Sequence, residues 1–213
     1  MEGSESRARI MDVGCATGDF LYYLAQNFPK AELYGIDRLP ILLEKAKRVN
    51  PGARFFEGDI FSGEIFGEKG ENIRADFHGS FDYIFMLGVH SIFDEIKIVI
   101  ENLKYLMRDG GKIYIFGIFN PCEIDVLIKS RSSYSDGEWE SGWNLFSLAT
   151  AVRTTDELGL YCKVEPFRIT IDIPENLSDP LRSYTFLRMD GEREVVNGLQ
   201  LLHKFYLLEI GYK

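Results

Sequence analysis

The stretch IMDVGCATGDF, residues Ile10–Phe20, decides the fold of this chain. It opens with an apolar run typical of a buried strand, passes through a turn that contains Gly14 and Gly18, and leads into helix-forming residues. Glycine in such a turn lets backbone N–H groups come close to a bound ligand, because a side chain there would block the approach. The stretch therefore predicts a strand–turn–helix unit that binds a ligand.

Two acidic residues follow this unit at useful distances. Asp37 ends the run LYGID, and Asp59 lies in EGDIF. The order strand, glycine turn, helix, strand and acid is typical of a nucleoside-binding half of an α/β protein. An acid at a strand end can also be a turn residue or a helix cap, and that interpretation stays open for both.

The glycine spacing distinguishes between possible nucleotide ligands. A dinucleotide fingerprint needs G-x-G-x-x-G, but this chain has Gly14, Ala16 and Gly18 without the final glycine of that pattern. No Gly-Lys-Ser/Thr of a P-loop follows, and Asp19 at the start of the helix would repel a phosphate. The pattern argues against a nicotinamide oxidoreductase and favours a ligand with no phosphate and some positive charge.

These segments resemble the class I S-adenosylmethionine-dependent methyltransferases. Asp12–Gly18 resembles their motif I, with Ala16 at the middle glycine, and residues 81–86 (FDYIFM) resemble their fourth strand. Residues 103–115 (LKYLMRDGGKIYI) resemble their approach to the fifth strand. Together with the two acids, five motifs lie in the family's order over roughly residues 9–119.

The resemblance implies S-adenosyl-L-methionine as cofactor and S-adenosyl-L-homocysteine as product. It also implies that Asp37 holds the ribose hydroxyls, that Asp59 faces the adenine amino group and that Ile60 packs on the base. Cys15 is expected to contribute its backbone N–H, since nothing places its thiol beside a base. The predicted cofactor-binding residues are Asp12, Gly14, Cys15, Ala16, Gly18, Asp37, Arg38, Asp59, Ile60 and Leu87.

Strand and helix patterns alternate along the chain, which predicts an α/β fold with a doubly wound, mostly parallel sheet. The resemblance implies seven strands, of which the last is antiparallel. We expect a single domain over residues 1–213, with a cofactor-binding half (1–119) and an acceptor-side half (120–213). Residues 62–80 are predicted to be a loop with one short helix, residues 120–144 a lid, and residues 184–199 a hairpin that turns at Asp190-Gly191.

Candidates for the methyl-transfer chemistry lie outside the glycine turn. His90 follows the predicted strand near residues 83–87 and is a candidate general base for an alcohol acceptor, or else a contact to the cofactor. Aromatic walls with a few polar groups are typical of small-molecule pockets, although each such residue could equally be packing. The candidate acceptor-binding residues are Tyr22, Trp139, Trp143 and Asn144.

The composition of the chain limits the kinds of partner that we expect it to bind. The 213 residues carry a formal net charge of −9 and no run of five basic residues, so we expect no large nucleic acid as substrate. Three cysteines lack metal-ligand spacing, which predicts no metal site and a reducing cytosol. No signal peptide and no apolar run near 18 residues are present, which predicts a soluble, cytoplasmic protein without membrane contact. The oligomeric state stays open between monomer and homodimer.

The predicted function is methyl transfer from S-adenosylmethionine to oxygen or nitrogen of a small molecule, such as a sugar or a natural-product intermediate. Two alternatives stay open. One is a non-catalytic module that binds S-adenosylmethionine, and the other is a protein or tRNA methyltransferase.

Overall fold

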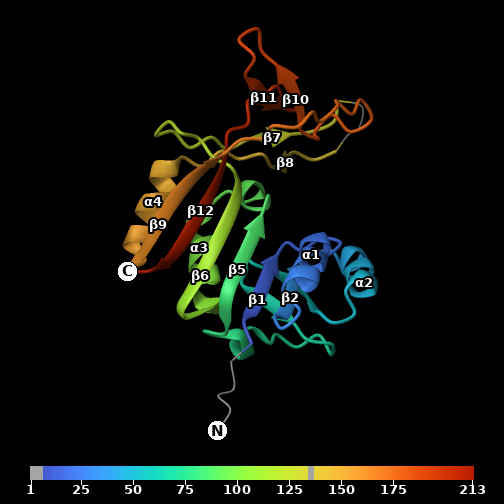
Figure 1. The fold of residues 1–213 in the computed structure, drawn as a ribbon, viewed down its shortest axis with the longest axis vertical. Helices are drawn as coiled ribbons and strands as arrows, with labels where there is room; N and C mark the ends of the chain where they lie inside the picture. The colour runs from blue at the N-terminus through green and yellow to red at the C-terminus, as the bar shows by residue number, and fades with distance from the viewer. Residues whose placement is uncertain (1–6, 134–136) are drawn as a thin grey trace.

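A computed structural model describes residues 7–133 and 137–213. Its centre is an eight-stranded sheet in the order β4-β3-β2-β1-β5-β6-β12-β9 (Figure 1). The parallel strands are β1 (Arg9–Val13), β2 (Glu32–Asp37), β3 (Arg54–Asp59), β5 (Phe81–Leu87) and β6 (Met107–Ile118). The strands β4 (Glu64–Phe66), β12 (Phe205–Tyr212) and β9 (Leu160–Phe167) each run antiparallel to the strand they join. The predicted doubly wound, mostly parallel sheet with an antiparallel last strand is confirmed.

The eighth strand, β4, lies in a region that the sequence predicted to be a loop. Residues 62–80 fold back on β3 instead, with Ile65 paired to Gly58 and buried. A Cβ at Gly58 would lie 2.7 Å from the carbonyl oxygen of Glu64, so the missing side chain lets this hairpin close. The short helix expected in the same region is η1 (Arg74–Phe77).

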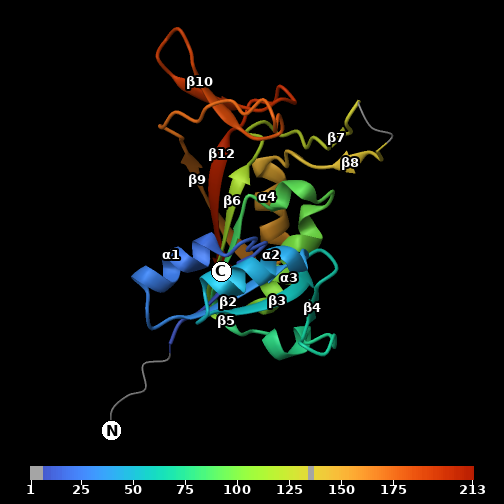
Figure 2. The same ribbon diagram turned by 90° about the vertical axis from the view of Figure 1, so that its right-hand side faces the viewer.

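Helices cover the sheet on both faces. On one face, α1 (Asp19–Asn27) and α2 (Pro40–Val49) bury Leu21, Leu24 and Leu43 against β1 and β2. On the other face, α3 (Ile96–Leu106) and α4 (Leu148–Glu157) build the larger hydrophobic core. Figure 2 shows α1 and the α3–α4 pair on opposite sides of the strands.

The acceptor-side half adds two small hairpins beyond the carboxyl ends of the parallel strands (Figure 1). The first is β7 (Lys129–Ser130) with β8 (Glu140–Ser141), within the predicted lid, of which residues 134–136 lie outside the described residues. The second, β10 (Tyr184–Leu187) with β11 (Arg193–Val196), confirms the predicted hairpin. None of the described helices is long and apolar enough to cross a lipid bilayer.

The helix α4 begins at Leu148, after the predicted lid. The residues just before it are not helical. Trp143 has a left-handed backbone (φ 63°), and Leu145 pairs with Val126 in a β-bridge. The Ser147 side chain then caps the helix by accepting a hydrogen bond from the Thr150 N–H at 3.0 Å.

Candidate active site

The glycine turn joins the carboxyl end of β1 to α1. The N–H groups of Gly14 and Cys15 donate to the carbonyl of Ile36 at 2.8 and 3.0 Å. Gly14 and Gly18 adopt left-handed conformations (φ 74° and 78°), which side-chain-bearing residues rarely tolerate. The sharp turn therefore depends on glycine at both positions.

The same glycines are also required by packing inside the protein. A Cβ at Gly14 would lie 2.4 Å from Cγ2 of Val89, and a Cβ at Gly18 would lie 2.7 Å from Nδ2 of Asn50. From the sequence, both glycines are expected to allow the close approach of a ligand. In the structure, the loop after β5 and the end of α2 also pack directly against the turn.

Asp37 holds the turn in place from the neighbouring strand. Its Oδ2 accepts a hydrogen bond from the N–H of Ala16, and its Oδ1 accepts one from the N–H of Leu39, both at 2.9 Å. The turn-residue interpretation of this acid is therefore correct. An ionised carboxylate has about four acceptor positions, so lone pairs remain for ribose hydroxyls, and that role stays a prediction.

Asp12 lies on β1 just before the turn, with only 4% of its surface exposed. Burial and, to a smaller extent, the charge of Asp37 together raise the pKa of its carboxyl to about 7. Burial also raises the pKa of the Cys15 thiol, which keeps that thiol protonated. A cationic ligand bound beside these two acids would stabilise the ionised form of Asp12.

The carboxyl end of β3 also carries an acid that accepts a hydrogen bond from a backbone N–H two residues later. Asp59 accepts a hydrogen bond from the N–H of Phe61 at 2.8 Å, which again makes a turn. Ile60 is buried in the main core, and its carbonyl accepts a hydrogen bond from Nδ2 of Asn102 at 2.7 Å. The expected contacts of Asp59 and Ile60 with adenine stay predictions, and the sequence argument missed the role of Asn102. Arg38 is exposed next to Asp37.

His90 lies in the short helix η2 (His90–Ile92) and is 1% exposed. Its Nε2 lies 2.9 Å from the carbonyl oxygen of Ile118, and its ring stacks on Phe119. Burial lowers its pKa to about 4, so the ring is neutral. Gly117 makes room for it, because a Cβ there would lie 2.3 Å from His90 Cε1. This geometry disfavours proton abstraction by His90, whose role as base stays a prediction.

Three of the four predicted acceptor-binding residues, Trp139, Trp143 and Asn144, lie in the predicted lid, and the fourth, Tyr22, lies on α1. Asn144 is fully buried, where its Nδ2 donates to the carbonyl of Phe93 and its Oδ1 accepts from the N–H of Ile128, both at 2.7 Å. Trp143 stacks on His203 with ring centroids 5.0 Å apart. Trp139 is exposed beneath the guanidinium of Arg131, and Tyr22 is exposed on α1; their roles stay predictions. Asn144 thus ties the predicted lid to the loop after β5.

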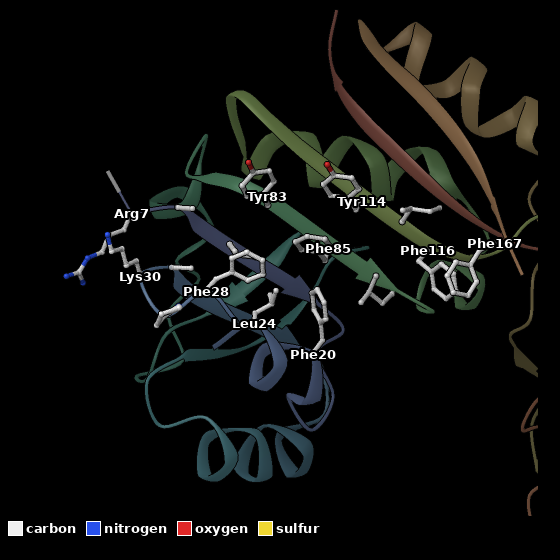
Figure 3. Close-up of a pocket in the computed structure, with 16 residues that line it drawn as sticks. Arg7, Phe20, Leu24, Phe28, Lys30, Tyr83, Phe85, Tyr114, Phe116 and Phe167 are labelled. Carbon is white, nitrogen blue, oxygen red and sulfur yellow. The ribbon is translucent and has the colours of Figure 1, made fainter. Parts of the chain in front are cut away.

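A large groove was not expected from the sequence. It has a volume of about 1270 Å³ and lies on the face of the sheet beside α1 (Figure 3). Leu87, one of the predicted cofactor residues, lines it at the carboxyl end of β5. Its only signal in the sequence was the alternation of aromatic and aliphatic residues along β5 and β6. Side chains at every second position of a strand point to the same face, so the aromatic ones gather on one face of the sheet.

Residues 11–113 match a family described as a methyltransferase domain. Residues 11–113 are thus a class I S-adenosylmethionine-dependent methyltransferase domain. Members of this family take the methyl group from S-adenosylmethionine, so the cofactor predicted from the glycine turn is confirmed.

Curated relatives of this chain differ in their acceptors. A malonyl-[acyl-carrier protein] O-methyltransferase of Paenibacillus sp. is 25% identical over 124 residues, which is 56% of this chain and 41% of the relative. A trans-aconitate 2-methyltransferase of Deinococcus radiodurans is 28% identical over 109 residues (51% and 37%). A tRNA U34 carboxymethyltransferase of Campylobacter hominis is 26% identical over 127 residues (60% and 42%). The matches span less than half of each relative's length.

Solved structures share the fold. A methyltransferase from Listeria monocytogenes, described as putative, superposes with a TM-score of 0.61 at 12% identity, covering 97% of this chain and 92% of that one. The complex of DhpI with S-adenosylhomocysteine superposes with a TM-score of 0.57 at 14% identity, covering 97% and 78%. Within the described residues, no three His, Cys, Asp or Glu side chains are grouped so that they could hold a metal ion.

Proposed function

We propose that this methyltransferase transfers the methyl group of S-adenosylmethionine to an oxygen of a small-molecule acceptor, and that this oxygen belongs to a carboxylate. The observation that carries the proposal is the combination of the Asp12–Asp37 pair at the glycine turn with an enclosed His90. The acids favour a cationic cofactor, and the enclosed histidine leaves the acceptor to supply its own negative charge.

The residues around the turn fit the cofactor. When bound, S-adenosylmethionine supplies a methyl group that its sulfonium makes electrophilic. Burial and Asp37 oppose the ionisation of Asp12, and a positive charge nearby would stabilise its ionised form. Asp37 would hold the ribose, and the glycine backbone of the turn, which carries no side chains at Gly14 and Gly18, would let the remainder of the ligand approach closely.

A carboxylate acceptor matches what the described residues offer. A carboxylic acid is ionised at neutral pH, so its methylation needs alignment with the donor but no general base. The malonyl and trans-aconitate relatives are named for acids, which supports the same class. Lys129 and Arg131 place cations on the predicted lid, where they could attract an anion despite the net charge of −9.

The test starts with calorimetric titration of the full chain with S-adenosylmethionine, S-adenosylhomocysteine and NAD. We expect micromolar binding of the first two and none of NAD. Methyl-labelled cofactor is then offered with trans-aconitate, with malonyl thioesters, and with amine and alcohol acceptors of matched size. The methyl ester formed from a carboxylate acceptor releases labelled methanol in mild alkali, whereas N-methyl and ether products do not. Label that is stable to alkali would contradict the proposal.

A second candidate function is a non-catalytic module that binds S-adenosylmethionine. It is favoured by one observation, namely that Asn144 is engaged in internal hydrogen bonds and Trp143 in a stack on His203, so neither is directed to an acceptor. Tight binding of the cofactor without methyl transfer to any acceptor would support it. Labelling of bulk tRNA in the same assay would support the tRNA alternative instead.

A further inference from the structure

One side chain of α3 holds the loop that follows β3. Nδ2 of Asn102 donates hydrogen bonds to the carbonyl oxygens of Ile60 at 2.7 Å and of Phe61 at 3.2 Å. Its Oδ1 accepts a hydrogen bond from Nη2 of Arg74 at 2.6 Å. Both N–H donors of the amide are therefore used. The orientation of the amide is fixed as well, because the reverse one would set its oxygen against two carbonyls and its N–H₂ group against a guanidinium.

The neighbours of Asn102 are arranged to allow this contact. The guanidinium of Arg74 lies over the ring of Tyr105, one turn further along α3, at 4.2 Å from the ring centre. A Cβ at Gly63 would lie 3.0 Å from Oδ1 of Asn102 and 3.0 Å from the Arg74 guanidinium, and Gly63 has a left-handed backbone (φ 76°). The loop after β3, the helix η1 and α3 thus meet at one amide group.

The same loop leaves one carboxylate oxygen of Asp59 without a protein partner. Oδ1 of this half-buried acid accepts from the N–H of Phe61, and its backbone carbonyl accepts from the N–H of Gly63, both at 2.8 Å. In the part of the chain that the structure describes, no group donates to Oδ2. The ring of Phe61 stacks on Phe93 with centroids 5.6 Å apart, which holds the loop from the side. Oδ2 is therefore available to accept a hydrogen bond from a ligand.

The order of the strands indicates which part of the cofactor would meet this oxygen. Asp12, Asp37 and Asp59 lie on β1, β2 and β3, which are consecutive neighbours in the sheet. In S-adenosylmethionine the ribose lies between the sulfonium and the adenine. If the sulfonium lies near Asp12 and the ribose at Asp37, the base extends toward β3, about 4.8 Å further along the sheet edge. The exocyclic amino group of adenine can donate there to Oδ2 of Asp59.

We propose that Asn102 is a positioning residue that sets the selectivity of the site for adenine. It acts through the carbonyls of Ile60 and Phe61, whose fixed positions hold the Asp59 carboxylate in place. Hypoxanthine carries an oxygen where adenine carries its amino group, so a fixed carboxylate accepts from adenine and repels hypoxanthine. A mobile loop would lose this distinction. The inference rests on the cofactor placement proposed above and not on the identity of the acceptor.

The test compares two ligands that differ only in the base, S-adenosyl-L-homocysteine and S-inosyl-L-homocysteine. Calorimetric titration of the full chain gives both dissociation constants, and their ratio measures the preference for adenine. We expect a preference of about 100-fold in the wild type. Asn102→Asp keeps the size of the side chain and an acceptor for Arg74, but it sets an oxygen against the carbonyls of Ile60 and Phe61. It should reduce the preference about tenfold.

A matched control makes the same substitution at another asparagine. Nδ2 of Asn27, exposed at the end of α1, also donates to a backbone carbonyl, that of Tyr23 at 2.8 Å. Asn27→Asp adds the same charge and should keep the wild-type preference. Asp59→Asn should lose the preference, because an amide can donate to the oxygen of hypoxanthine. Asn102→Ser removes the contacts to the loop without adding a charge, and it tests the same point if Asn102→Asp does not fold.

Circular dichroism and thermal unfolding establish which variants remain folded. A merely structural role of Asn102 would weaken the binding of both ligands equally and leave their ratio unchanged, and that result would overturn the proposal. An intact preference in Asp59→Asn, or no preference in the wild type, would overturn it as well. Because no acceptor is present, these outcomes do not depend on the proposed carboxylate methylation.

Discussion

The N–H of Ala16 donates a hydrogen bond to Oδ2 of Asp37 across 2.9 Å, so the acid that ends β2 fastens the glycine turn that ends β1. The second oxygen of the same carboxylate fastens Leu39 at the start of α2. One side chain therefore sets the spacing of three elements around the cofactor site.

Replacement of Asp37 by alanine should weaken binding of both S-adenosylmethionine and S-adenosylhomocysteine. The expected loss is about 1–3 kcal/mol, because two backbone N–H groups lose their acceptor and the ribose loses a partner. Isothermal calorimetry measures it, with Glu44→Ala on the exposed side of α2 as the control. An unchanged affinity in Asp37→Ala would contradict the ribose assignment.

Asp12→Asn should stabilise the free protein at neutral pH. The pKa of Asp12 is about 7 in the folded chain and 3.8 ordinarily, so the unfolded chain loses this proton first as pH rises. Asp12 stabilises the fold below about pH 4 and loses that contribution as pH rises to about 7. The gain in Asp12→Asn should therefore grow over this window and reach about 1–3 kcal/mol above it, measured by denaturant unfolding at several pH values.

The same carboxyl should make cofactor binding depend on pH. A sulfonium ligand favours ionised Asp12, so wild-type affinity should rise from about pH 6 to about pH 8 with release of a proton. Calorimetry in two buffers with different ionisation enthalpies counts that proton. Asp12→Asn should bind more weakly and without this pH dependence, and an equally pH-dependent variant would exclude Asp12 as the source.

Gly14→Ala should destabilise the protein by about 1–3 kcal/mol through backbone strain and contact with Val89. Val89→Ala in the same chain removes the close contact but leaves the strain. A double-mutant cycle with Val89→Ala alone should therefore show that the two changes are coupled. Strict additivity would mean that the turn shifts away from Val89 without resistance.

His90→Gln should retain turnover within a few-fold of the wild type, because glutamine can still donate to the carbonyl of Ile118. His90→Ala should mainly reduce stability, by about 2–4 kcal/mol, since it leaves a cavity beside Phe119 and an unpaired carbonyl. Steady-state kinetics and thermal unfolding separate the two effects. A loss of turnover of about 100-fold in His90→Gln, with stability intact, would restore the histidine as general base.

Asn144→Leu should loosen the predicted lid. The change leaves the N–H of Ile128 and the carbonyl of Phe93 without their buried partner. Limited proteolysis should cut residues 120–144 faster than in the wild type, while the core unfolds at nearly the same temperature. An exposed change nearby, Trp139→Leu, is the control, and equal cleavage of both variants would argue against the anchoring role of Asn144.

The sequence by itself determined the features that depend on short stretches of chain. The apolar run before Gly14, the spacing of Gly14 and Gly18 and the acids after two strands predicted the strand–turn–helix unit, the parallel sheet and the cofactor. Periodicity, turn chemistry and strand–acid spacing are local properties, and they are therefore readable without knowledge of what packs on them.

Tertiary structure alone decided what each side chain meets across the fold. Gly58 allowed β4 to pair where a loop was expected, and Gly117 opened the space that encloses His90. The lid buried Asn144, and the face of β5 and β6 beside α1 lines a groove. These outcomes depend on residues that are distant in sequence and on which face of the sheet is covered, and no local pattern specifies either.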